Sequence, residues 1–140
     1  MAGLKLRIIT PERVVLEQDV DQVTATAVDG QLSILPGHEP IVTPLAIDIL
    51  HYKTAKEEDF AAIMGGVLEV KNNEVTVLSN VAELDTEVDV ARAHQAKERA
   101  EAEKTQKTDK LDVYVAEMAI SRAIARMKAA GLRERRRGRS

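Results

Sequence analysis

Five charged residues in the second half of the sequence have the spacing of a phosphate-binding site. Asp89 and Arg92 are three positions apart, and Arg99 follows Arg92 by seven, so a helix would place all three on one face. Arg122 and Arg126 are four apart and would share a face of a second helix. Guanidinium groups bind phosphate oxygens bidentately, whereas a carboxylate accepts from an amine or a hydroxyl group. If the two helices are antiparallel neighbours, this spacing predicts a polyphosphate site.

The same residues also have a simpler interpretation as ordinary helix surface. Asp89 would then cap the first helix, because an Asp at a helix N-terminus accepts a hydrogen bond from a backbone N–H group. The arginines would form a solvated face and pair with carboxylates such as Glu98, Glu101 and Glu117. On the residues alone, this interpretation is favoured over a phosphate site.

The sequence lacks the residue patterns of an enzyme. No Gly-x4-Gly-Lys loop is present, since Gly65-Gly66 is followed by Val67-Leu68. The three histidines, at positions 38, 51 and 94, are far apart and show no ligand spacing. The chain has no cysteine, which excludes disulfides and thiolate metal sites. We therefore expect no catalytic residues, no metal site and no catalytic cofactor.

A second motif lies in the first half of the sequence, at positions 29–40. Asp29-Gly30 is a tight-turn pattern, the next residues form a short strand, and Pro36–Pro40 is a rigid loop that presents His38. Plain hairpin architecture explains these residues without any function.

Glycine and proline divide the chain into two parts. All four prolines lie at or before Pro44, and neither residue type occurs between Gly66 and Gly131. Short alternating segments separated by turns predict strands within residues 1–84, whereas the stretch after residue 84 is suited to helices. We expect helices at about 87–104 and 108–130, with Gly131 as a C-terminal cap. The predicted fold class is α+β: an antiparallel β-sandwich (1–84), an antiparallel two-helix hairpin (85–132) and a basic, disordered tail (133–140).

Charge is distributed unevenly between these parts. Residues 1–84 carry a net charge of −7 and residues 85–140 a net charge of +4. A basic end on an acidic body fits an acidic protein surface, a nucleotide or a nucleic acid. The sequence is poor in the aromatic residues that stack on bases, with only Phe60, Tyr52 and Tyr114. The alternatives to a nucleotide-binding subunit are therefore a nucleic-acid-binding module that uses the basic end, or a scaffold without a ligand.

No apolar run approaches the ~20 residues that span a bilayer, so we expect a soluble chain.

Three segments together resemble the epsilon subunit of F-type ATP synthases. GQLSILPGHEP at 30–40 is similar to the family pattern Gly-x-Leu-x-Ile-Leu-Pro-x-His-x-Pro. MGGVLEV at 64–70 is similar to Gly-Gly-x-x-Glu-Val, and VDVARA at 88–93 to the nucleotide-binding motif Ile/Leu-Asp-x-x-Arg-Ala. The likeness extends to about Leu132, and the basic extension after it is longer than the family leads us to expect.

The resemblance implies a ten-stranded sandwich and a mobile helical hairpin on the rotor of the synthase, where the subunit couples gamma to the c-ring during proton-driven ATP synthesis. It implies contacts with gamma, the c-ring and the alpha/beta catalytic head, at the cytoplasmic face of the cell membrane and with no direct membrane contact. The extended hairpin would inhibit ATP hydrolysis, and ATP, with or without Mg²⁺, would bind the folded hairpin as a regulatory ligand. Because the arginine set is complete, the resemblance favours the phosphate site over the plain helix surface. It implies ATP-binding residues Glu83, Val88, Asp89, Arg92, Ala93, Arg99, Arg122 and Arg126, with Val88 in place of a larger aliphatic residue, and interface residues Gln31, Leu32 and His38.

Overall fold

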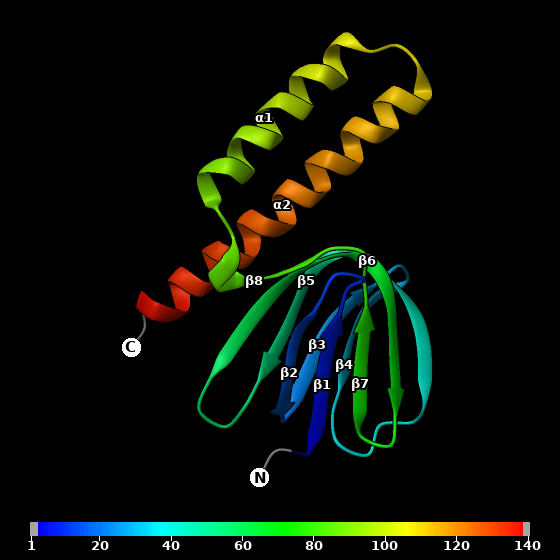
Figure 1. The fold of residues 1–140 in the computed structure, drawn as a ribbon, viewed down its shortest axis with the longest axis vertical. Coiled ribbons are helices and arrows are strands. Elements are labelled where there is room, and N and C mark those ends of the chain that lie inside the picture. The colour runs from blue at the N-terminus through cyan, green and yellow to red at the C-terminus, as the bar shows by residue number, and fades with distance from the viewer. Residues whose placement is uncertain (1–2, 139–140) are drawn as a thin grey trace.

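A computed structural model describes residues 3–138 as a curled β-sheet followed by two helices (Figure 1). The described strands are β1 (Leu4–Ile9), β2 (Val14–Val20), β3 (Gln22–Ala27), β4 (Gly30–Ile34), β5 (Ile41–Lys53), β6 (Glu58–Lys71), β7 (Glu74–Leu78) and β8 (Ala82–Leu84). A 3-10 turn, η1 (Asp85–Glu87), leads to helices α1 (Val90–Gln106) and α2 (Lys110–Gly138).

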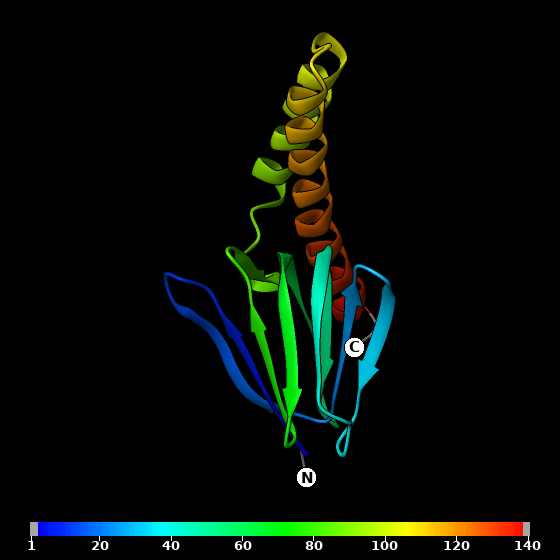
Figure 2. The same ribbon diagram turned by 90° about the vertical axis from the view of Figure 1, so that its right-hand side faces the viewer.

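The strands form one sheet that folds over on itself into two layers (Figure 2). The strand order is β2-β1-β7-β6-β5-β3-β4, and β8 pairs with β6. All pairs are antiparallel except β1 with β7, which run parallel. The sandwich followed by two helices confirms the predicted fold class.

Eight strands are described where the resemblance implied ten, because β5 and β6 each run through both layers. Residues 41–45 and 47–52 lie in the single long strand β5, and residues 60–64 and 67–70 lie in the single long strand β6. The bend in β6 lies at Gly65 and Gly66, whose φ angles of 78° and 116° are accessible to glycine. A side chain at Gly66 would also collide with the carbonyl group of Leu78.

The core of the sandwich is aliphatic and lies between the two layers. Its largest fully buried side chains include Leu6, Ile8, Ile34, Leu50 and Leu68. In β1 the buried residues alternate with partly exposed ones, as a strand that covers a core on one face requires. All members of this cluster lie between positions 4 and 82, so the helices contribute nothing to it.

A shortened chain that ends at Leu84 is therefore expected to fold alone and to melt in one cooperative transition. Thermal unfolding followed by circular dichroism measures this. The intact chain is the control. A shortened chain that unfolds gradually, without a transition, would contradict the prediction.

The hairpin begins with a cap and is packed through alanines. Asp89 is the N-cap of α1, and its carboxylate accepts from the backbone N–H group of Arg92 at 3.1 Å. The helix thus begins at Val90, later than predicted, because residues 85–87 form the 3-10 turn. Asp109 accepts from the N–H group of Leu111 at 2.8 Å at the start of α2. The two helices approach closely through buried alanines that recur every seven positions, at 93 and 100 in α1 and at 116, 123 and 130 in α2.

The predicted end of the second helix is wrong. Gly131 does not cap α2, and the tail expected to be disordered is helical as far as Gly138; residues 139–140 lie outside the described part. Gly131 lacks the positive φ angle of a glycine that caps a helix, so the helix continues through this position. Contacts of Leu132 and Arg136 with the sandwich favour its continuation. Tertiary contacts of this kind override local helix-stop signals.

One face of α2 packs on the outside of β5 and β6. Ala125 and Ala129 contact a small apolar cluster built around Phe60 and Ala62. Three ion pairs frame this contact: Lys128 with Asp48 at 3.0 Å, Arg126 with Glu83 at 2.8 Å, and Arg136 with Asp59. Burial alone would raise the pKa of Asp48, but hydrogen bonds from the Ile49 N–H group and Lys128 outweigh it and hold this pKa below its usual value. The hairpin is therefore seen in a docked, folded position.

Candidate functional site

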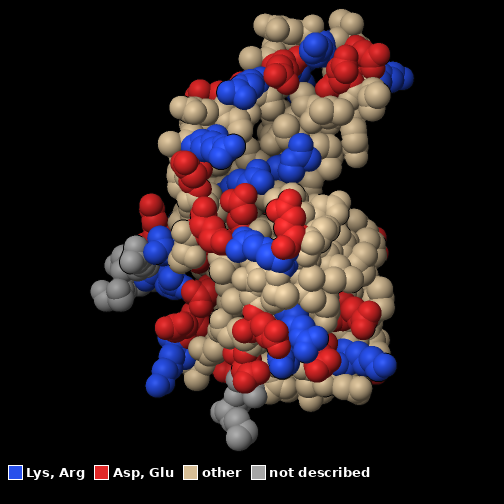
Figure 3. All heavy atoms as spheres, viewed as in Figure 1, with Lys and Arg blue, Asp and Glu red and all other residues tan. Residues whose placement is uncertain are grey.

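A charged cleft of about 440 Å³ lies where the hairpin meets the sandwich. Strand β8 and turn η1 form one side, and the first turns of α1 and the middle of α2 form the others. Its lining residues are Glu83, Glu87, Asp89, Arg92, Ala93, Ala96 and Arg126. Acidic and basic side chains are interspersed along the hairpin and at its junction with the sandwich (Figure 3). The volume is within the range of ~300–1,000 Å³ that is typical of small-molecule sites.

The structure brings five of the eight predicted ATP-binding residues together in this cleft. These are Glu83, Asp89, Arg92, Ala93 and Arg126. The other three, Val88, Arg99 and Arg122, do not line it. Arg99 is exposed two turns further along α1, and Arg122 is half-buried one turn before Arg126 on α2.

The carboxylate of Asp89 has a structural role in this state, as the simpler interpretation proposed. One of its oxygens accepts from the Arg92 backbone N–H group. An ionised carboxylate has about four acceptor positions, so capping leaves Asp89 capacity for a ligand.

The structure does not show the arginine–carboxylate pairs that the simpler interpretation proposed. The three carboxylates pair with other residues: Glu98 Oε1 lies 3.3 Å from His94 Nδ1, Glu101 Oε1 lies 3.6 Å from Lys97 Nζ, and Glu117 Oε1 lies 3.4 Å from Lys104 Nζ. Within residues 3–138, no ion pair joins the guanidinium groups of Arg92, Arg99 or Arg122 to a described carboxylate.

Of the two arginines that line the cleft, Arg126 already forms an ion pair within the chain. Its Nε atom donates to Glu83 Oε1 at 2.8 Å, and both side chains are about one-quarter exposed. A phosphate group that entered the cleft would have to compete with Glu83 for this guanidinium. Glu83 would then be free to accept from a ligand amine.

Two residues that line the cleft, Glu87 and Ala96, were not predicted from the sequence, nor was the contact of Arg13 with Glu87. Glu87 accepts from the Leu84 N–H group at 2.8 Å and from Arg13, which comes from the loop between β1 and β2, at 3.0 Å. The bond from Arg13 holds the pKa of Glu87 below its usual value. Ala96 follows Ala93 by one helical turn, and that spacing was the available signal. The contact of Arg13 spans 74 positions and has no local signal.

The three predicted interface residues lie on or near β4. Gln31 is exposed at its start, and Leu32 is partly buried against the sandwich core. His38 is half-buried beyond the other end of the strand, where its Nδ1 atom lies 2.6 Å from the Glu39 carbonyl oxygen. The Pro36–Pro40 loop is fixed to the turn between β6 and β7, because Asn73 accepts from the Gly37 N–H group at 2.8 Å. Gln31 and His38 thus face different surroundings.

In the described part of the chain, no group of three or more His, Asp or Glu side chains is placed to hold a metal ion. Neither described helix combines the length and the apolar character needed to cross a bilayer. The fold class is thus a β-sandwich that carries a docked two-helix hairpin, with a charged cleft at the junction. Comparison with known proteins identifies the family. The ATP synthase Delta/Epsilon chain beta-sandwich domain matches residues 3–85, and the long alpha-helix domain of the same chain matches residues 86–131.

The similarity extends over nearly whole chains. The ATP synthase epsilon chain of Moorella thermoacetica is 44% identical over 132 residues, which cover 94% of this chain and 98% of the relative. That of Halalkalibacterium halodurans is 41% identical over 132 residues, with coverages of 94% and 99%. A chain in the cryo-EM structure of Euglena gracilis mitochondrial ATP synthase (OSCP/F1/c-ring) superimposes with a TM-score of 0.79 at 26% identity, over 93% of this chain and 82% of that one.

The protein belongs to the ATP synthase epsilon chain family. It is accordingly a non-catalytic subunit of the ATP synthase stalk and takes part in ATP synthesis. A chain of the Tetrahymena thermophila central stalk and c-ring, at 16% identity and a TM-score of 0.59, shares the fold.

Proposed function

We propose that the subunit couples gamma to the c-ring and regulates ATP hydrolysis through its hairpin, which binds ATP when folded. It would do so at the cytoplasmic face of the cell membrane, bound there through the complex. The observation that carries the regulatory part is the cleft, whose walls come from both helices and from β8. A ligand in this cleft touches the sandwich and the hairpin together, so it stabilises the folded arrangement in preference to an extended one.

The residues of the cleft fit ATP. The small side chains of Ala93 and Ala96 leave room for a flat base or a ribose. The carboxylate of Glu83 or Asp89 is suited to the adenine amine, a donor that guanine replaces with a carbonyl acceptor. Arg92 and Arg126 are suited to phosphate oxygens, and helical spacing aligns Arg99 and Arg122 with them for the outer phosphates. Each carboxylate of the cleft already accepts a hydrogen bond within the chain: Glu83 from Arg126, Glu87 from Arg13, and Asp89 from the Arg92 N–H group. None of them is held ready as a base for water, so binding without hydrolysis is expected.

The partners are proposed from the surfaces that the fold leaves open. Gln31 and Leu32 would contact the c-ring, and His38 would lie toward gamma. Gln31 and Leu32 lie near the start of β4, whereas His38 lies in the loop beyond its other end, so the two sets face different surroundings. The basic face of α2, which begins at Arg122, would contact an acidic surface of the alpha/beta head when the hairpin is extended. Each exposed ion pair contributes only ~0.2–1 kcal/mol, so several must act together.

Removal of all residues after Leu84 is expected to raise ATP hydrolysis by the assembled synthase, because the inhibitory hairpin is lost while the docking sandwich remains. The measurement is steady-state hydrolysis by complexes that contain the full or the shortened chain. It must be made where trapped MgADP does not limit the rate. Equal rates in complexes that both retain the subunit would contradict the regulatory role.

A further inference from the structure

The last two turns of α2 dock on the sandwich and lie outside the family match. That match ends at residue 131, whereas α2 continues to Gly138. Leu132 packs against the cluster around Phe60 and Ala62, on the outside of β6. The proposed ATP cleft uses none of the residues in this terminal segment, which comprises residues 132–138.

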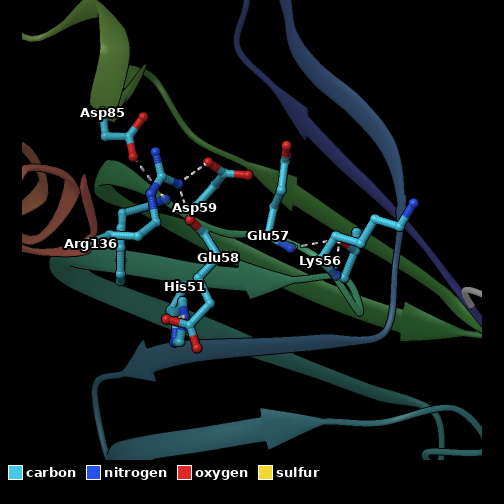
Figure 4. A network of polar contacts seen from close by, with 9 residues as sticks. His51, Lys56, Glu57, Glu58, Asp59, Asp85 and Arg136 are labelled. Carbon is cyan, nitrogen blue, oxygen red and sulfur yellow. Dashed lines mark hydrogen bonds and ion pairs between the residues drawn. The ribbon is translucent and has the colours of Figure 1, made fainter. Parts of the chain in front are cut away.

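Arg136 makes the main polar contacts of the terminal segment. Its Nη1 atom donates both to the backbone carbonyl oxygen of Glu58 and to the carboxylate of Asp59, at the start of β6 (Figure 4). The Arg136 and Asp59 side chains are 30% and 24% exposed, so water screens this pair only in part. A guanidinium held by both a carbonyl and a carboxylate is fixed in direction as well as in charge.

A second carboxylate, that of Asp85, lies near this contact. Asp85 is only 5% exposed and accepts from the Phe60 N–H group at 3.3 Å. Burial and the like charge of Asp59 raise the pKa of Asp85, while the Phe60 N–H group and the positive charges of Arg136 and Arg133 favour its ionised form. Undocking of α2 would take both cations away and leave the charges of Asp59 and Asp85 facing each other. The acidic patch of Asp59 and Asp85 therefore matches the basic terminal segment.

These contacts cannot survive in an extended hairpin, because Arg136 moves with α2 whereas Glu58 and Asp59 belong to the sheet. We infer that the terminal segment is a latch, in which Arg136 on Asp59 holds the hairpin folded in the absence of nucleotide. The inference depends on the proposed function only in requiring that the hairpin can open. Such a latch determines the ratio of folded to extended chains in the absence of nucleotide. ATP binding would then raise the folded fraction further.

The test measures the position of the hairpin in the full chain without nucleotide. Because the natural chain has no cysteine, spin labels at Glu69→Cys on β6 and Lys107→Cys at the hairpin tip report the folded fraction from their distance distribution. Arg136→Gln is expected to raise the ratio of open to folded chains about tenfold, as expected for a charge-assisted bond that is partly buried. A chain ending at Gly131 should open at least as much.

Two comparisons make the test specific. Arg135→Gln removes the same charge from the neighbouring, exposed position and should leave the ratio within about twofold, since surface charges contribute little. Asp59→Asn should open the hairpin by itself. Arg136→Gln should have a smaller effect in the Asp59→Asn chain than in the parent chain, because the Arg136–Asp59 pair is already lost there and only the bond to the Glu58 carbonyl remains. The latch is refuted if Arg136→Gln opens the hairpin no more than Arg135→Gln, or if its effect is undiminished in the Asp59→Asn chain. Since no nucleotide is present, failure of the ATP site would not alter either result.

Discussion

Joint replacement Asp89→Ala and Arg92→Ala is expected to weaken ATP binding by at least a hundredfold, to below the measurable range. Loss of one charged partner typically costs ~1.5–3 kcal/mol, which is roughly ten- to hundredfold in affinity. Two such losses give at least a hundredfold when they add, and the two single variants measure how far these neighbours in the cleft depart from additivity. Calorimetric titration of the intact chain with ATP measures the change.

Loss of the helix cap is a separate effect that needs its own control. Asp89 caps α1, and removal of such a cap costs ~0.5–2 kcal/mol of helix stability. The double variant Asp109→Ala with Lys97→Ala removes a cap and a cation from the same hairpin, outside the cleft. It should bind ATP within a few-fold of the parent chain. If Asp89→Ala with Arg92→Ala binds as tightly as this control, Asp89 is a cap only and the ATP site lies elsewhere.

Gly66→Ala is expected to have the largest effect on the stability of the sandwich. At a φ angle of 116° an alanine is strained by ~1–3 kcal/mol. Its Cβ atom would also collide with the backbone at Leu78 on β7, and overpacking adds ~1–3 kcal/mol. The free energy of unfolding should therefore fall by at least ~2 kcal/mol, as measured by chemical denaturation.

Gly131→Ala is the matched control for Gly66→Ala. It lies within α2, where an added Cβ atom meets nothing within 4 Å. Alanine is favoured over glycine in a helix interior by ~0.5–1 kcal/mol, so this change should stabilise α2 slightly. An equal loss of stability in both variants would show that the close contact at Gly66 is not the cause.

Strands and turns whose signals lie in neighbouring residues could be predicted from the sequence. The alternation in Leu4–Ile9 and the turn at Asn72-Asn73, where both residues have positive φ, involve only neighbouring positions. The parallel pairing of β1 with β7 and the continuity of β6 through Gly65-Gly66 depend on contacts distant in sequence. Gly65 and Gly66 lie inside β6, where their positive φ angles bend one strand.

The difference between local signals and contacts distant in sequence also applies to the site and the C-terminus. Helical spacing predicted a shared face for Asp89 and Arg92, and convergence with Arg126 only if the two helices are antiparallel neighbours; these three residues line the cleft. The bond between Arg13 and Glu87 links the first loop to the hairpin and has no signal in either segment. Gly131 and the basic residues after it have the local pattern of a helix end. Docking of Arg136 on Asp59 favours continuation of the helix, and that contact could not be seen from the sequence.

The central claim is that ATP holds the hairpin in its folded position. The most direct measurement follows the distance between labels at Glu69→Cys and Lys107→Cys during titration of the intact chain with ATP and, separately, with GTP. The account predicts that ATP raises the folded fraction to saturation, that GTP at equal concentrations raises it much less, and that Asp89→Ala with Arg92→Ala removes the response. A distance distribution that ATP leaves unchanged, or that GTP shifts equally well, would contradict it.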